Sequence, residues 1–227
     1  MAATQPIALT LTRARATRSA QNSVKDVWVW DEKTIADWDA AIADTQAGQQ
    51  AVAANEADLL ARRGSLDNAL SDLADQTRRG LALAKIRYRN DGARRTVVAR
   101  LTGRSDSRTR ALESASAWAS AWAELDPAFA PTTGSTLAAF NTLRARCETL
   151  QNEYAQARAD LRASAETQNR RAARLDGDCK AWYAAATRIF PASTAEGAMI
   201  RGTIPTSYSK ETDIGVKEPA APAPPPA

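Results

Sequence analysis

Residues 136–190 read TLAAFNTLRARCETLQNEYAQARADLRASAETQNRRAARLDGDCKAWYAAATRIF. One row of side chains recurs in this stretch every seven residues, at Phe140, Cys147, Tyr154, Leu161, Gln168, Leu175, Trp182 and Ile189. A companion row, which includes Leu143, Leu150 and Ala157, completes an a/d pattern with a period of 3.5 residues. No proline interrupts the stretch, and helix interiors exclude proline. The pattern predicts one long helix with a buried seam, capped at its start by Ser135.

A second long helix is predicted over residues 31–90. A mostly apolar row of residues recurs there in steps of three and four, and it also includes Gln49, Glu56 and Arg63. No proline lies between residues 7 and 126. Asp31 is the expected N-cap, and Gly92 is the expected stop. Each glycine inside a helix costs about 1 kcal/mol relative to alanine, so we expect a kink or an interruption near Gly64.

The two helices have similar lengths, which favours antiparallel partners. We therefore predict an all-α fold, a long coiled-coil-like helical hairpin over residues 31–190, with a short helical cap at the turn formed by residues 93–134. Trp118 and Trp122 share one face of that cap and are interpreted as core, with an exposed partner-binding patch as the alternative. One register of the hairpin sets Leu70 against Tyr154 and Glu56 against Gln168.

The two ends of the chain differ from the hairpin in composition. Residues 1–30 are rich in Thr, Ala and Arg, and Ile7, Leu9 and Leu11 alternate with smaller residues, so we predict an extended N-terminal arm. Residues 191–208 are expected to form a short capping segment with a one- or two-turn helix after a capping box at Ser193. Residues 209–227 form a Pro/Ala-rich tail.

One short C-terminal motif has a counterpart elsewhere. The segment AWYAAATRIFP at residues 181–191, followed by IRGTIP at residues 200–205, resembles the end of the helical region in some uncharacterised bacterial helical-hairpin proteins. The resemblance implies a bacterial origin and carries no activity.

The composition argues against most catalytic chemistry. The chain has no histidine, which removes the commonest general base and the commonest transition-metal ligand. Cys147 and Cys179 are 32 residues apart in one predicted helix, too far for an internal disulfide. We interpret them as buried hydrophobic residues, with an intermolecular bridge or a reactive thiol as the alternatives. We expect no enzymatic activity, no catalytic residues, no metal site and no cofactor.

Charge is distributed unevenly along the chain. Residues 31–77 hold ten acidic and three basic residues, whereas residues 78–110 hold eleven basic and two acidic ones. This arginine-rich block allows three interpretations: nucleic-acid binding through phosphates, self-association with the acidic flank of another copy, or a solvated helix face. The candidate interaction residues in it are Arg78, Arg79, Arg87, Arg89, Arg94 and Arg95.

Aromatic residues gather at the other end of the predicted hairpin. Trp28 and Trp30 are expected to converge there with Trp38, Trp182 and Phe190. Structural packing is one interpretation, and a docking surface for another subunit is the other. Trp28 and Trp30 therefore complete the set of candidate interaction residues.

The resulting hypothesis is a non-enzymatic structural protein that assembles with itself into a homo-oligomer, a fibre or a larger assembly, through its terminal arms and charge-complementary surfaces. The alternative is a nucleic-acid-associated protein that uses the block at residues 78–110. A third possibility is an adaptor that displays the Pro-rich tail to a partner. With neither a signal peptide nor a run of about 18 apolar residues in view, we expect a cytoplasmic protein without a membrane partner.

Overall fold

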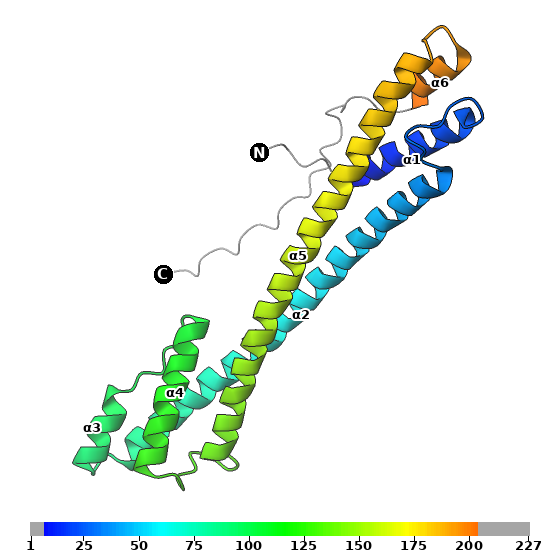
Figure 1. Ribbon diagram of the computed structural model, residues 1–227. Helices are drawn as coiled ribbons and strands as arrows, with labels where there is room; N and C mark the ends of the chain where they lie inside the picture. The colour runs from blue at the N-terminus through cyan, green and yellow to red at the C-terminus, as the bar shows by residue number, and fades with distance from the viewer. Residues whose placement is uncertain (1–6, 204–227) are drawn as a thin grey trace. The chain divides into compact units, whose positions relative to one another are not determined.

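The computed structural model describes residues 7–203, and every regular element in that range is an α-helix. The helices are α1 (Ile7–Val24), α2 (Ile35–Arg87), α3 (Gly92–Arg100), α4 (Arg108–Leu125), α5 (Leu137–Ile189) and α6 (Ala195–Thr203) (Figure 1). The predicted all-α class is confirmed. The predicted tail at residues 209–227 and the last residues of the capping segment lie outside the described range.

The chain divides into two compact units. Unit 1 takes the residues up to Thr45 and from Ala172 onward, and unit 2 takes residues Gln46–Arg171. The two long helices, α2 and α5, contribute to both units, whereas α1 and α6 belong to unit 1 and α3 and α4 to unit 2. The prediction had grouped residues 31–190 together and left α1 and α6 aside.

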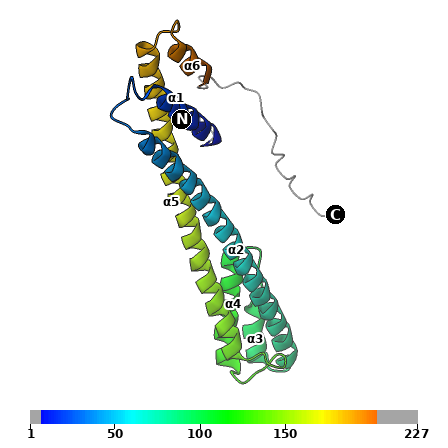
Figure 2. The ribbon, with the colours of Figure 1, turned by 90° about the vertical axis from the view of Figure 1, so that its right-hand side faces the viewer.

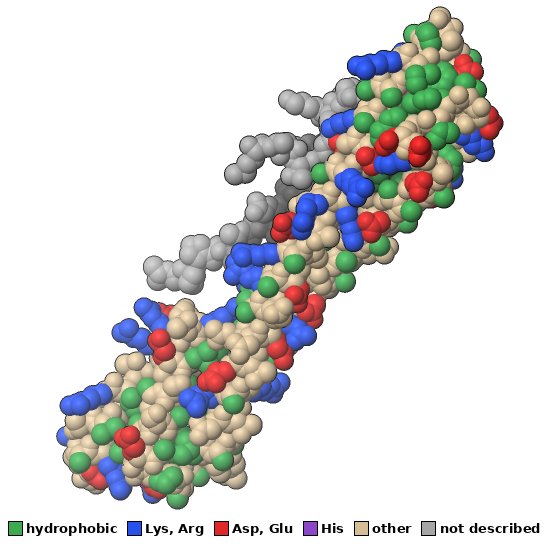
Figure 3. Space-filling model, in the orientation of Figure 1, with side chains coloured by type: hydrophobic (Ala, Val, Ile, Leu, Met, Phe, Trp, Pro, Cys, Tyr) green, Lys and Arg blue, Asp and Glu red, His purple; other side chains and the backbone are tan. Residues whose placement is uncertain are grey.

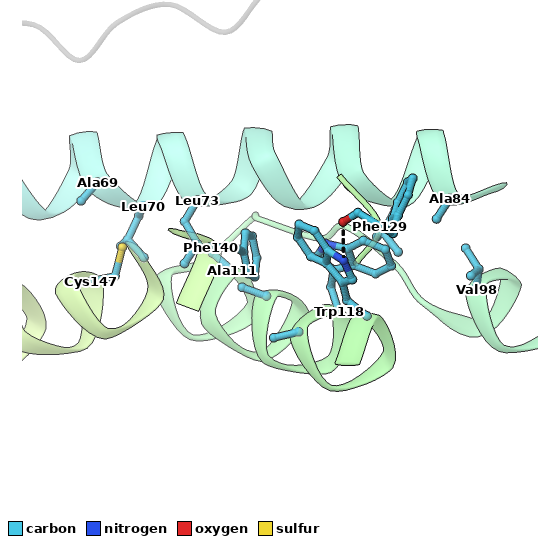
Figure 4. Close-up of a cluster of buried hydrophobic side chains, with 14 of the residues drawn as sticks. Ala69, Leu70, Leu73, Ala84, Val98, Ala111, Trp118, Phe129, Phe140 and Cys147 are labelled. Carbon is cyan, nitrogen blue, oxygen red and sulfur yellow. Dashed lines mark hydrogen bonds between the residues drawn. The ribbon is translucent and has the colours of Figure 1, made fainter. Parts of the chain in front are cut away.

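Unit 2 is a helical bundle at the end where α3 and α4 join α2 and α5 (Figure 2). Its core combines Leu73 of α2, Val98 of α3, Trp118 of α4 and Cys147 of α5 (Figure 4). Trp118 and Trp122 stack with their ring centroids 5.3 Å apart, and both are almost completely buried. Their interpretation as core residues is therefore confirmed. The burial of these two indole rings stabilises the packing of α4 against the long helices.

Within unit 2, α2 and α5 run antiparallel, in a register that differs from the predicted one. Nη1 of Arg62 in α2 lies 2.5 Å from Oε2 of Glu153 in α5. Gln168 lies against Gly48, where a Cβ atom would fall 1.9 Å from its Oε1. The predicted partner of Gln168 was Glu56, eight residues further along α2, so that register is wrong. The bulky amide of Gln168 fits where α2 has no side chain.

The predicted seam of α5 is present, but that of α2 is displaced. Seven of the eight side chains in the first α5 row are buried or half-buried, and Ile189 is the exception at 46% exposed. In α2, Gln49, Glu56 and Arg63 were predicted to face the seam and are exposed instead. The helix is not interrupted near Gly64, because α2 is continuous from Ile35 to Arg87.

Unit 1 overturns the prediction of an extended N-terminal arm. Residues 7–24 form α1, whose buried side chains Leu11, Ala14, Thr17 and Val24 recur at helical spacing. The short alternation from Ile7 to Leu11 was misleading, because the helical periodicity continues for three further turns. α1 packs against α6 and is joined to α5 by a buried ion pair between Arg13 and Asp176. The side-chain oxygen of Gln21 accepts a hydrogen bond of 2.5 Å from Nε1 of Trp182.

Threonines, and not the predicted residues, cap the two long helices. Thr34 caps α2, since its Oγ1 accepts a hydrogen bond from the backbone N–H of Asp37 at 3.2 Å. Asp31, the predicted cap, lies in the preceding turn with a φ of 51°. Thr136 caps α5 by accepting from the N–H of Ala139 at 3.1 Å, one residue after the predicted Ser135.

The remaining boundaries shift by a few residues. Gly92 was predicted to stop the first long helix, but α2 already ends at Arg87 and Gly92 opens α3. Asp91 caps α3 by accepting from the N–H of Arg94 at 3.1 Å. A cap precedes α6, but it is formed by Thr194 and not by the predicted Ser193: Thr194 Oγ1 accepts a hydrogen bond from the N–H of Gly197 at 3.1 Å.

Candidate interaction surfaces

The arginine-rich block of residues 78–110 lies wholly in unit 2, on the end of α2, on α3, on the following loop and on the start of α4. Five of its eleven basic residues are held by carboxylates of the same unit. Arg78 pairs with Asp75, Arg87 with Asp126, Arg94 with Asp91, Arg108 with Asp67 and Arg110 with Asp106.

The other six basic residues of the block are exposed, and none of them forms an ion pair with a residue in the described range. They are Arg79, Lys85, Arg89, Arg95, Arg100 and Arg104, and we call them the open basic set. Of the six arginines predicted from the sequence, Arg79, Arg89 and Arg95 belong to this set, and Arg78, Arg87 and Arg94 do not. The sequence reasoning missed Lys85, Arg100 and Arg104.

Aromatic side chains near the open basic set are committed to the core. Tyr88 is 4% exposed, and its ring centroid lies 6.1 Å from that of Phe129. The guanidinium carbons of Arg87 and Arg94 lie 5.9 and 5.5 Å from the Tyr88 ring centroid. Tyr88, the one aromatic residue of the 78–110 block, is therefore covered.

A groove of about 380 Å³ separates α2 from the start of α4, and its lining includes Asp67, Arg78, Asp106 and Arg108. Both arginines are already paired, Arg108 Nη2 at 2.7 Å from Asp67 Oδ1. Its charges are thus balanced, and the groove does not add to the open basic set.

Trp28 and Trp30 belong to unit 1 and pack inside it. The Trp28 ring centroid lies 5.9 Å from that of Trp182 and 6.0 Å from that of Phe190. Trp30 lies 6.0 Å from Trp38, and Nζ of Lys33 sits 5.2 Å from the Trp30 ring centroid. Both tryptophans are half-buried, so the structural-packing interpretation describes them.

The acidic part of α2 within unit 2 is largely neutralised by its own chain. Asp58 pairs with Arg62 at 3.0 Å, and Asp67 lies between Arg63 and Arg108. Long-range attraction between this flank and the arginine block of another copy is correspondingly weaker than the sequence counts indicate.

Close to the first and last residues of unit 2, α2 and α5 form a bare pair of helices. Across residues 49–65 of α2 no side chain is buried, and across residues 151–167 of α5 only Ala157 is. Leu60 is 66% exposed there. The low burial of this stretch could not be predicted from the sequence, because a heptad pattern does not give the buried fraction of each side chain.

The two cysteines are free and buried. Burial raises the pKa of the Cys179 thiol from its ordinary 9.0 to about 11, and it raises the pKa of Cys147 as well. A thiol held protonated in this way is a poor nucleophile. Within residues 7–203, no group of three or more Cys, Asp or Glu side chains is placed to hold a metal ion.

Comparison of the chain with protein-family models, with curated proteins and with solved structures gives no match. None of the helices within residues 7–203 combines the length and apolar character needed to cross a membrane.

Proposed function

We propose that the protein is a non-enzymatic helical protein that associates with itself, and that a second copy packs on the bare stretch of unit 2. The observation that carries the proposal is the single buried side chain, Ala157, among the 34 residues at 49–65 and 151–167. Helices gain most of their stability in proteins from packing of an apolar face, not from propensity alone. A second copy would provide that packing.

The surface between the two helices of this stretch is poorly filled. Val52 and Leu59 of α2 are half-buried, as are Tyr154 and Leu161 of α5. The polar Asn55 and Arg62 share the inner side of α2 with the aliphatic residues. Such a seam stabilises a helix pair less than a full a/d row of apolar residues, which favours a further layer of helices.

A second apolar stripe runs along the exposed side of α2 at spacings of three and four residues. It consists of Ala53, Ala57, Leu60, Ala61 and Gly64, and it contains no charged side chain. Small residues on both sides of Leu60 let another helix approach closely. In a two-fold contact the same patch meets itself, so a Leu60 side chain from each copy would lie on the small residues of the other.

This proposal differs from the sequence-based hypothesis in its means of association. Residues 7–24, expected to reach neighbouring copies as an arm, are packed as α1 in unit 1. Three of the five acidic residues of α2 in unit 2 already pair with arginines of the same chain, namely Asp58, Asp67 and Asp75. We therefore propose association through apolar contact in place of charge complementarity. A fibre or larger assembly would need a second, heterologous contact in addition.

The test is the molar mass in solution, measured by size-exclusion chromatography with light scattering at low and high salt. We expect the mass of two chains for the wild type at both salt concentrations, because apolar contacts are not screened. Leu60→Glu should give a monomer. Ile86→Glu is the matched control, since Ile86 is 62% exposed in the same unit but lies outside the stripe.

Cysteine crosslinking locates the contact. Ala57→Cys should form a disulfide-linked dimer under mild oxidation, whereas Ala82→Cys, an equally exposed position of α2, should not. The native thiols are buried and do not compete. A wild type that stays monomeric at micromolar concentration, or a dimer that Leu60→Glu leaves intact, would overturn the proposal.

A further inference from the structure

The open basic set leaves a surface of unit 2 with uncompensated positive charge. Its six members lie within 26 consecutive residues: Arg79, Lys85, Arg89, Arg95, Arg100 and Arg104. The 78–110 block contains two acidic residues, and both form ion pairs with other arginines, Asp91 with Arg94 and Asp106 with Arg110. Figure 3 shows basic side chains along the edge that α3 and the loop before α4 form. Like charges held this close repel one another, which an anionic partner would relieve.

The local structure holds these side chains at the surface. α3 buries one side chain, Val98, so the rest of its short length faces outward. Its start is fixed by the Asp91 cap, and its end bonds back through the N–H of Leu101 to the carbonyl of Val98 at 3.2 Å. Arg104 is placed by its backbone, whose carbonyl accepts a hydrogen bond of 3.0 Å from Ser114 Oγ. The guanidinium groups are therefore carried by an ordered scaffold.

The composition of the set indicates which anion it suits. Five of its six members are arginines, whose planar guanidinium forms paired hydrogen bonds with phosphate oxygens. The apolar surface beside them is limited to single exposed side chains such as Val97, so α3 lacks the apolar face that inserts into a membrane. Phosphates displayed in a row, as along a nucleic acid, match a set of separate exposed arginines better than one small anion does.

The absence of an aromatic platform among the described residues of this surface fixes the mode of binding. Tyr88 is buried in the unit 2 core, with arginines over its ring, so bases cannot stack on it. Contacts would therefore be made with the sugar–phosphate backbone, which carries no sequence information. We infer that the open basic set binds the phosphodiester backbone of a nucleic acid without sequence preference.

The experiment measures the affinity of the full chain for a short fluorescent DNA duplex, and for a single strand of the same length, by fluorescence anisotropy. The salt concentration is varied from about 50 to 200 mM. If all six side chains reach phosphates of the duplex, the slope of log K against log salt concentration is about −5. A scrambled duplex sequence should bind with the same affinity.

Two triple variants separate this surface from general charge. Arg89→Gln/Arg95→Gln/Arg100→Gln removes half of the set and should reduce the slope to about −2.5. Arg146→Gln/Arg158→Gln/Arg162→Gln removes the same charge from exposed positions of α5 in unit 2 and should leave the slope unchanged. Circular dichroism verifies that both variants keep their helices.

Three outcomes would overturn the inference. One is no binding of either DNA at the lowest salt concentration, and another is an equal loss in both triple variants. The third is binding to vesicles containing phosphatidylserine in the absence of DNA binding, which would identify a membrane surface instead. The monomeric Leu60→Glu variant should still bind DNA through the open basic set of each chain. Loss of self-association and loss of DNA binding can therefore be distinguished.

Discussion

The indole ring of Trp118 in α4 packs directly on the backbone of Gly80 in α2. A Cβ atom built on Gly80 would lie 2.7 Å from Trp118 Nε1 and 3.0 Å from Cε2. Both residues are buried, and Trp118 is 1% exposed. The glycine therefore allows the close approach that joins the cap to the long helix of unit 2.

Gly80→Ala should destabilise unit 2 by about 1–3 kcal/mol, because the rigid, buried ring has no room to retreat from the added methyl group. The matched control is Gly177→Ala, at an exposed position of α5 where nothing lies within 4 Å of the added atom. There the better helix propensity of alanine should stabilise α5 by about 0.5–1 kcal/mol. Urea unfolding followed by tryptophan fluorescence measures both changes, and stabilisation by both substitutions would refute the close packing.

The caps give a prediction that separates two neighbouring residues. Thr136→Ala should cost about 1 kcal/mol of unfolding free energy, because it removes the acceptor for the N–H of Ala139. Ser135→Ala should change the stability little, since the Ser135 side chain makes no hydrogen bond within the described residues. The same unfolding measurement compares the two. A larger loss at Ser135 would restore the boundary expected from the sequence.

The long α5 helix could be predicted because the signals that specify it lie within its own sequence. A proline-free stretch with a repeat of seven residues specifies both the helix and its buried face, and the structure differs at its end, where Ile189 is exposed. α1 was not recognised, because Thr, Arg and Gln share its buried face with Leu11, Val24 and two alanines, which leaves only a weak apolar periodicity along the chain. Only the partners in α5, such as Asp176 and Trp182, make those polar side chains suitable for burial.

The register and the open basic set depend on non-local contacts. Gln168 and Gly48 are 120 residues apart, and no pattern along the chain links the amide to the position without a side chain. The arginine block was visible as composition, but its division into paired and open residues was not. Asp126 and Asp67, which hold Arg87 and Arg108, lie outside the block and reach it only through folding.

The buried ion pair in unit 1 predicts a large difference between two nearby aspartates. The side chains of Arg13 and Asp176 are 6% and 11% exposed, and Lys180 Nζ lies 2.6 Å from the same carboxylate. Asp176→Ala should cost about 3–5 kcal/mol, because the buried guanidinium of Arg13 loses the carboxylate it faces. Asp178→Ala removes a more exposed pair, to Lys33 at 2.5 Å, and should cost about 1 kcal/mol or less.

Thermal or urea unfolding of the two variants provides the comparison. Restoring part of the stability of Asp176→Ala by adding Arg13→Met would show that the loss came from the broken Arg13–Asp176 pair and not from the missing aspartate side chain alone. Equal losses in Asp176→Ala and Asp178→Ala would contradict the difference in burial on which the prediction rests.

Cys179 makes the stability of unit 1 depend on pH in the alkaline range. The thiol is fully buried, and burial raises its pKa from 9.0 to about 11. The folded state therefore holds this proton more tightly than the unfolded state, so the contribution to stability is complete below about pH 9 and is lost as the pH rises to about 11. The loss should be about 1–3 kcal/mol. Urea unfolding of wild type and Cys179→Ala at several pH values isolates it, because other alkaline groups titrate equally in both proteins. We expect the difference in stability between the two proteins to shrink in that window, and parallel curves would show that the thiolate is not excluded from the core.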